Sequence, residues 1–381
     1  MRYSKNFVSY IFLSAFFYLG LSLWQTLFSL FLDYRGFTIN EIGVAGTLIF
    51  SLRFLLSFFA GIIIDRVNLK INIFLSNILS FTYIVLLNYV SNFYLLILIC
   101  FIAGFASSLY VQLSVKIISF LSKVRERGTI FSIYFFSTDI AYMIGSALSG
   151  SIVQNYGYIF LNQVSGMIFL LTSIFSLILF PDIGIKPDHS TLPSFKNLVK
   201  NRIIILLTLS LILHDFSIFI SISYMPLLAK HVLLLSETAI GFLAAVKRFS
   251  KLSFQIISGK SIDKFGGKIA LILHFILTSI GYIGYGLSRN FTDMILTNIF
   301  LGFSITLDLP ARRLLLSSSV PKEYVATISG ISDTLVGLFI IPSPIIGGYI
   351  WNNIDPRLVF IVAGIANLSS LVPIFFMSEK R

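Results

Sequence analysis

The feature that most constrains this chain is the absence of any charged residue between Lys70 and Lys116. About 20 consecutive apolar residues are enough for a helix to cross a bilayer, so this stretch is long enough for two crossings. Across 381 residues, hydrophobic types make up 56% and charged types only 12%. Soluble domains carry about 25% charged residues, and disordered chains are more polar still. The sequence therefore predicts an all-α integral membrane protein that crosses the bilayer many times.

Breaks of charge, Gly, Pro and Asn divide the apolar sequence into twelve predicted spans. The longest connection, 181–201, contains three prolines and falls at the centre of the chain. We interpret it as a cytoplasmic linker between an N-terminal six-helix half, 1–180, and a C-terminal six-helix half, 202–381. The predicted spans are 7–32, 41–64, 71–90, 93–116, 129–154, 158–180, 202–229, 236–260, 269–288, 291–316, 326–351 and 357–377.

Lys and Arg lie mainly on one side of this predicted topology. Of the 28 in the chain, 20 fall on one side, four on the other and four within spans. Because basic residues accumulate in cytoplasmic loops, we expect both termini in the cytoplasm. The same pattern accounts for the net charge of +12 without nucleic acid as a partner. We expect a multi-pass protein of the plasma membrane that acts as a monomer.

Cysteine and histidine usage bears on cofactors and on enzymatic function. Cys100 is the only cysteine and can form no disulfide within the chain. The four histidines, at 189, 214, 231 and 274, are not spaced as metal ligands, so we predict neither a metal site nor a cofactor. A membrane-embedded enzyme would need a clustered ligand set or a nucleophile beside its base, and the sequence shows neither. We therefore predict that the chain is not an enzyme.

The two halves of the sequence repeat at an offset of 198 residues. Apolar composition alone aligns Ile with Leu by chance, but it does not align Gly, Asp and Lys. A duplication of six spans is typical of many secondary transporters, whose substrate binds between the halves. The aligned pairs include Gly43 with Gly241, Gly61 with Gly259, Asp65 with Asp263, Lys70 with Lys268, Gly104 with Gly302 and Gly150 with Gly348.

A short loop after the second span of each half carries the same pattern. Its first glycine lets a neighbouring helix approach closely, and Asn68 and Gly266 suit a left-handed turn. Its aspartate can face the positive N-terminal end of an adjacent helix. The first copy contains Gly61, Asp65, Arg66, Asn68 and Lys70, and the second contains Gly259, Asp263, Lys264, Gly266 and Lys268.

This double motif resembles the loop motif of the major facilitator superfamily, Gly-x-x-x-Asp-Arg/Lys-x-Gly-x-Arg/Lys. Arg127 lies in a charged loop that is similar to the loop before the fifth span of that family. The resemblance implies two six-helix bundles that move a solute by alternating access. It also implies a cytoplasmic gate, in which Asp65 faces Thr327 and Asp263 faces Thr129. The fourth span lacks the Arg that proton-driven drug exporters of the family usually carry.

Eight charged residues are predicted inside spans. A charge at mid-membrane costs about 2.5–3.5 kcal/mol on insertion scales, so such residues are usually paired or functional. The resemblance places span two against span eleven and span five against span eight. We therefore hypothesise pairs between Arg53 and Asp333, and between Asp139 and a base of span eight. The eight are Arg53, Asp139, Asp215, Lys247, Arg248, Lys251, Asp308 and Asp333.

Asp215 is the first candidate for proton coupling, because a lone acid in a low-dielectric setting can exchange a proton within the physiological range. The adjacent His214 is either a packed histidine or a proton relay. Asp308 ranks second, because it can instead pair with Arg312 or Arg313 nearby. We expect a proton-coupled secondary transporter of a small organic solute. The alternatives are efflux of hydrophobic drugs by proton antiport and, from another class, a membrane sensor or an uncoupled channel.

Overall fold

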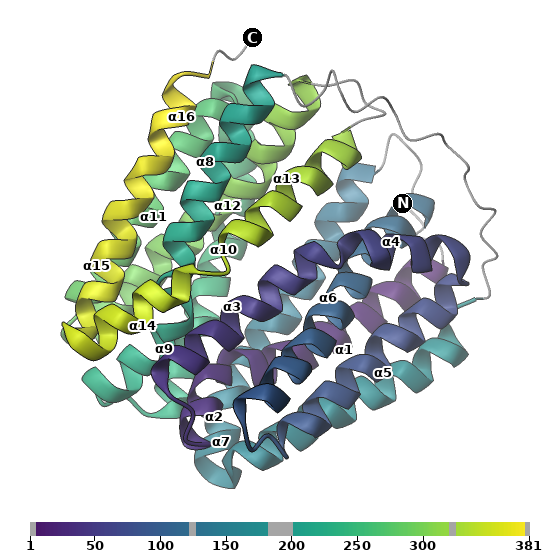
Figure 1. Ribbon diagram of the computed structural model, residues 1–381. Coiled ribbons are helices and arrows are strands. Elements are labelled where there is room, and N and C mark those ends of the chain that lie inside the picture. Colours follow the sequence, from purple (N-terminus) through teal and green to yellow (C-terminus); the bar gives the residue numbers. More distant parts are fainter. Residues whose placement is uncertain (1–4, 122–126, 182–200, 320–324, 378–381) are drawn as a thin grey trace. The chain divides into compact units, whose positions relative to one another are not determined.

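The computed structural model describes residues 5–121, 127–181, 201–319 and 325–377, and all regular structure in these ranges is helical (Figure 1). The all-α prediction is confirmed. The elements are α1 (Lys5–Thr26), α2 (Phe28–Tyr34), α3 (Ile39–Leu55), α4 (Ser57–Arg66), α5 (Leu69–Leu87), α6 (Phe93–Leu121), α7 (Arg127–Leu179), α8 (Arg202–Phe219), η2 (Ile222–Tyr224), α9 (Met225–Leu227), η3 (Leu228–Val232), α10 (Glu237–Phe265), α11 (Gly267–Leu287), α12 (Phe291–Ser319), α13 (Val325–Phe339), α14 (Ser343–Asn353), α15 (Pro356–Asn367), η5 (Leu368–Ser370) and α16 (Leu371–Phe375).

Nine stretches of the described residues are long and apolar enough to cross a membrane. One of them, Ile130–Leu179, includes Gly157, whose φ of 84° is not helical and divides α7. Positive φ favours glycine, because other residues meet a steric penalty there. The predicted break between spans five and six falls at this residue. The multi-pass helical architecture is confirmed, whereas the count of twelve spans stays a prediction.

The residues before the next helix, Asn68 and Gly266, differ in backbone conformation between the two loop motifs. Gly266 adopts a φ of 88° before α11, as predicted for a left-handed residue. The prediction for Asn68 is wrong, because its φ is −52°. Its side chain instead accepts a hydrogen bond from the backbone N–H of Lys70 at 2.9 Å. This is the N-cap role in which Asn satisfies a backbone donor of the first helical turn.

Asn68→Ala is expected to lower the free energy of unfolding by about 1 kcal/mol, because it removes this cap from α5. Asn68→Asp keeps a side-chain acceptor and serves as the matched control. Thermal unfolding of the two purified variants in detergent makes the comparison. Equal midpoints would show that the cap contributes nothing.

The chain divides into two compact units, and each unit includes one short segment from the other half of the sequence. Residues 38–47 belong to unit 2 although they lie in the first half of the sequence, and residues 236–245 belong to unit 1. These two segments are equivalent under the 198-residue offset, so the exchange follows the repeat. Unit 1 comprises Met1–Phe37, Leu48–His189 and Ser236–Ala245, and unit 2 comprises Thr38–Thr47, Ser190–Leu235 and Val246–Arg381.

Equivalent glycines mark the same helix crossing in each unit. In unit 1 a Cβ built at Gly104 would lie 3.1 Å from the carbonyl oxygen of Ile49. In unit 2 a Cβ at Gly302 would overlap the carbonyl oxygen of Lys247. Ile49 and Lys247 are themselves equivalent under the offset. The sequence repeat therefore corresponds to a repeated packing of backbone against glycine.

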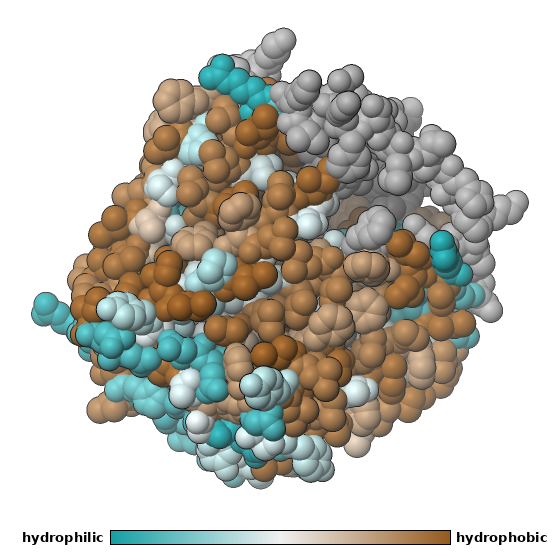
Figure 2. Space-filling view, viewed as in Figure 1, coloured by the Kyte–Doolittle hydropathy of each residue, from teal (hydrophilic) through white to brown (hydrophobic). Residues whose placement is uncertain are grey.

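The helices of unit 2 that carry charge pack directly on one another. Helix α11 packs against α12 and α15, and α8 packs against α13, α15 and α16. In unit 1, α7 packs along α1 and α5, and α6 packs against α4 and α5. Hydrophobic side chains cover most of the visible surface in Figure 2, as expected for helices in contact with lipid.

Candidate functional site

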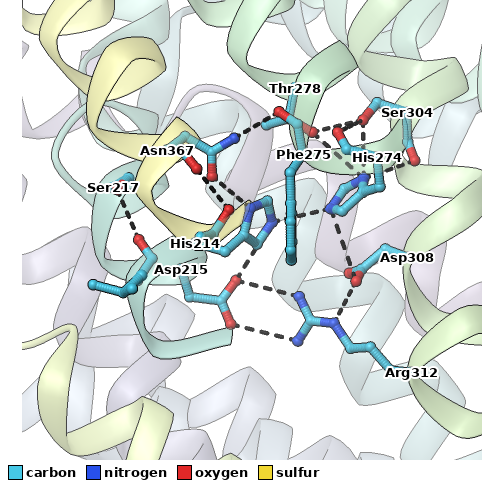
Figure 3. Close-up of polar contacts among 12 residues, drawn as sticks. His214, Asp215, Ser217, His274, Phe275, Thr278, Ser304, Asp308, Arg312 and Asn367 are labelled. Carbon is cyan, nitrogen blue, oxygen red and sulfur yellow. Dashed lines mark hydrogen bonds and ion pairs between the residues drawn. The ribbon is translucent and has the colours of Figure 1, made fainter. Parts of the chain in front are cut away.

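A cluster of charged and polar side chains lies inside unit 2, where α8, α11, α12 and α15 meet (Figure 3). Its side chains come from four largely apolar helices, so the charged groups must pair with one another to offset the cost of their burial. Two of its members come from α8, one from α11, two from α12 and one from α15. In that order they are His214 and Asp215, His274, Asp308 and Arg312, and Asn367.

Arg312 joins two carboxylates. Its Nε donates to Oδ1 of Asp308, one helical turn earlier on α12. Its two terminal nitrogens donate to the two oxygens of Asp215, each at 3.5 Å. A planar guanidinium suits such a double contact, since its five N–H groups point in fixed directions. The prediction of Asp215 as a lone acid is therefore wrong, whereas the pairing of Asp308 with Arg312 is confirmed.

Two histidine rings lie directly behind this ion triplet. The Nε2 atoms of His214 and His274 are 3.0 Å apart. Oδ1 of Asp215 lies 3.9 Å from Nε2 of His214, and Oδ1 of Asp308 lies 3.8 Å from Nε2 of His274. The histidine side chains are 2% and 3% exposed, against 17% and 23% for the two aspartates. The carboxylates therefore lie between the buried rings and the more accessible side of the cluster.

Sequence reasoning missed His274 and Asn367. His274 is followed by Thr278 and Tyr282 at intervals of four, so α11 presents a polar stripe along one face. Residues four apart share a helix face. That stripe was the available signal. Asn367 gave none, because one amide near the chain's end is common in any helix.

The other predicted intramembrane charges lie in both units. Asp333 on α13 belongs to unit 2 and acts electrostatically on Asp215. The guanidinium of Arg53, in unit 1, lies 4.8 Å from the ring centre of Phe54, and Asp139 is buried in unit 1. Both hypothesised pairings join different units and stay predictions. The bases proposed as partners of Asp139 lie on α10 in unit 2 and are Lys247, Arg248 and Lys251.

The loop motifs are described in part. Lys268 donates to the carbonyl oxygens of Met377 at 2.6 Å and Phe375 at 3.2 Å, so it binds the free carbonyls at the end of α16. The ammonium of Lys264 lies 5.2 Å from the ring centre of Phe265. Lys268 therefore has a structural contact that the gating prediction did not include.

The two motif glycines do not show the predicted close helix approach. A Cβ built at Gly61 or Gly259 meets no atom within 4 Å in the described part of the chain. Arg66 is exposed in the last turn of α4. The side chains on which the gate prediction depends lie outside the described residues, so the gate stays a prediction. They are Asp65, Arg127, Thr129, Asp263 and Thr327.

Unit 1 carries aromatic rings at the positions equivalent to the two aspartates of the cluster. Under the offset, Asp215 corresponds to Phe17 and Asp308 to Tyr110. The rings of Phe17 and Tyr110 stack with centroids 3.4 Å apart and an interplanar angle of 2°. Asp215 and Asp308 both bind Arg312, so each equivalent pair of positions lies close together although the side chains differ. Among these equivalent positions, the charge is confined to the second half of the sequence.

Two curated proteins show local similarity to this chain. The "Putative metabolite transport protein YwtG" of Bacillus subtilis is 30% identical over 124 residues, which cover 32% of this chain and 27% of that protein. The "Quinolone resistance protein NorA" of Staphylococcus aureus is 24% identical over 172 residues, covering 45% and 44%. The chain therefore matches less than half of the length of either relative.

Solved structures match along almost the whole chain. A mutant form of the nucleoside transporter NupG superposes with a TM-score of 0.84 at 12% identity, covering 98% of this chain and 100% of that one. A POT family transporter in complex with 5-aminolevulinic acid gives a TM-score of 0.84 at 12% identity, covering 98% and 96%. The sequence profile of the Major Facilitator Superfamily matches residues 10–233 and 207–381. The chain belongs to the Major Facilitator Superfamily.

Proposed function

We propose that this protein is a proton-coupled secondary transporter of a small organic solute that works by alternating access. The observation that carries the proposal is the cluster of two acids, one Arg and two His inside unit 2. Each charge placed within the membrane costs about 2.5–3.5 kcal/mol on insertion scales. The acids and histidines of this cluster can bind and release a proton, so the charge of the cluster can differ between the outward-open and inward-open states of the transporter. The cluster as a whole replaces the lone Asp215 as our coupling site.

The location and assembly of the protein belong to the same proposal. A multi-pass protein with both termini in the cytoplasm agrees with 20 of 28 basic residues on one side of the predicted topology. We place it in the plasma membrane as a monomer. Its partners are then the solute, protons and the surrounding lipid.

The charge balance of the cluster limits the solute class. Arg312 already contacts two carboxylates, so its positive charge is compensated and the cluster gives no preference for an anion. A neutral or cationic solute fits this balance better. The second candidate function, efflux of hydrophobic drugs by proton antiport, is favoured by similarity to NorA, whose name states quinolone resistance.

Uptake into proteoliposomes tests the proposed function. We expect saturable uptake of at least one compound from a panel of nucleosides, amino acids and hydrophobic cations, and about tenfold stimulation by an imposed pH gradient. Asp308→Asn is expected to abolish the stimulation, because it removes one carboxylate of the cluster. Downhill flux without saturation or counterflow would indicate a channel, and gradient-independent uptake would exclude proton coupling.

A further inference from the structure

The hydrogen bonds of Asn367 fix the tautomer of His214. The amide nitrogen of Asn367 donates to the carbonyl oxygen of Phe275 at 2.9 Å and to Oγ of Ser279 at 3.0 Å. A backbone carbonyl only accepts, so the amide nitrogen must face it. The amide oxygen therefore faces Nδ1 of His214, at 2.7 Å. Since that oxygen also only accepts, Nδ1 of His214 carries a hydrogen and donates it.

The tautomer of His274 is fixed in the same way. Its Nδ1 lies 2.9 Å from the carbonyl oxygen of Ser304. The hydroxyl of Ser304 donates to the carbonyl oxygen of His274 at 2.9 Å, so that hydroxyl has no second hydrogen to offer the ring. Nδ1 of His274 therefore also carries a hydrogen.

These assignments leave two lone pairs facing each other. In a neutral imidazole only one nitrogen carries hydrogen, so Nε2 of both rings would be bare. The two Nε2 atoms are 3.0 Å apart and buried. Two bare nitrogens at this distance repel, whereas one proton between them makes a hydrogen bond of ordinary length. One proton between the two rings therefore accounts for the 3.0 Å separation of their Nε2 atoms.

Charge counting supports one proton. Asp215 and Asp308 contribute two negative charges and Arg312 one positive charge, so one protonated histidine makes the four-helix cluster neutral. Outside the four helices of the cluster, Asp333 of α13 acts electrostatically on Asp215. On α11, the hydroxyl of the buried Tyr282 is itself under the influence of Asp215. Asp333 adds negative charge, which favours the proton further.

We propose that His214 and His274 bind one shared proton between their Nε2 atoms, and that this is the proton the transporter carries. The proton reaches the buried pair through the carboxylates, which are the more exposed members of the cluster and lie 3.8 and 3.9 Å from the ring nitrogens. When a carboxylate takes the proton from the pair, the rings lose their attraction and α8 loses its link to α11. That the transporter carries this proton rests on the proposed proton coupling, whereas the presence of the shared proton does not.

Solid-state nitrogen-15 NMR of the lipid-reconstituted protein detects the shared proton directly and does not depend on a transport assay. In a His189→Gln/His231→Gln background, only the two paired rings carry label. We expect protonated Nδ1 on both rings and a coupling between the two Nε2 nuclei that His274→Gln removes. Three results would overturn the proposal of a shared proton. They are an unprotonated Nδ1, two uncoupled Nε2 signals, and a signal that changes when a chelator removes a bound metal.

Transport by histidine variants tests the role of the proton. His214→Gln and His274→Gln are each expected to lower gradient-driven uptake by at least about tenfold and to retain solute counterflow within about threefold. His231→Gln, outside the cluster, is the matched control for loss of a histidine. Gradient-driven uptake at the wild-type rate in both variants would overturn the proposal. If the NMR coupling is present but wild-type uptake ignores the gradient, proton coupling fails while the shared proton stands.

Discussion

Arg312→Gln is expected to destabilise the protein by about 3 kcal/mol, because it removes the guanidinium that contacts both carboxylates and leaves them close together. Removing one partner of a buried ion pair typically costs about 3–5 kcal/mol. The aspartates are 17% and 23% exposed, which places the loss at the lower end of this range. The midpoint of thermal unfolding in detergent measures the effect. Gradient-driven uptake should be lost as well.

A charge-balanced double variant separates electrostatics from packing. Arg312→Gln/Asp308→Asn removes one charge of each sign, so it should be more stable than Arg312→Gln alone. Arg312→Lys retains the charge but cannot contact both carboxylates with one planar group. We expect its stability to fall between that of Arg312→Gln and the wild type. If the two single losses add within about 0.5 kcal/mol in the double variant, the residues do not interact.

The helices of this protein could be predicted because lipid imposes one rule on the whole chain. Every backbone group in the membrane must be bonded within its own segment, so long apolar runs become helices. Their limits follow from local chemistry, as Gly157 and Gly266 show with their positive φ values. Asn68 was predicted wrongly, since Asn suits both a left-handed turn and an N-cap, and only the surrounding backbone selects between them.

The charged cluster could be predicted only where its contacts are local. Asp308 and Arg312 are four residues apart on one helix, so their pairing is a property of helix geometry. Asp215 and Arg312 are 97 residues apart in sequence, and nothing in either segment indicates the other. The same holds for the two histidines, 60 residues apart. Acidic residues inside spans thus indicated that a site exists, whereas its members depend on how four helices pack.

Gly150→Ala is expected to destabilise the protein by about 1–3 kcal/mol, the usual cost of overpacking. In unit 1, a Cβ at Gly150 would overlap the carbonyl oxygen of Glu237 and lie 2.6 Å from Cα of Thr238. Both neighbours are backbone atoms, so the first turn of α10 must move away from α7. The contact is reciprocal, because a Cβ at Gly241 would lie 2.7 Å from the carbonyl oxygen of Ser146.

Gly166→Ala is the matched control on the same helix. Its Cβ would lie 3.5 Å from the side chain of Ile84, an ordinary contact, and alanine in a helix gains about 0.5–1 kcal/mol over glycine. The two variants should therefore shift the unfolding midpoint in opposite directions. Gly348→Ala, the equivalent of Gly150 in unit 2, meets the side-chain oxygen of Asn40. That side chain can rotate away, so its loss should be smaller than that of Gly150→Ala. Equal midpoints for all three would mean that α7 and the start of α10 are not in close backbone contact.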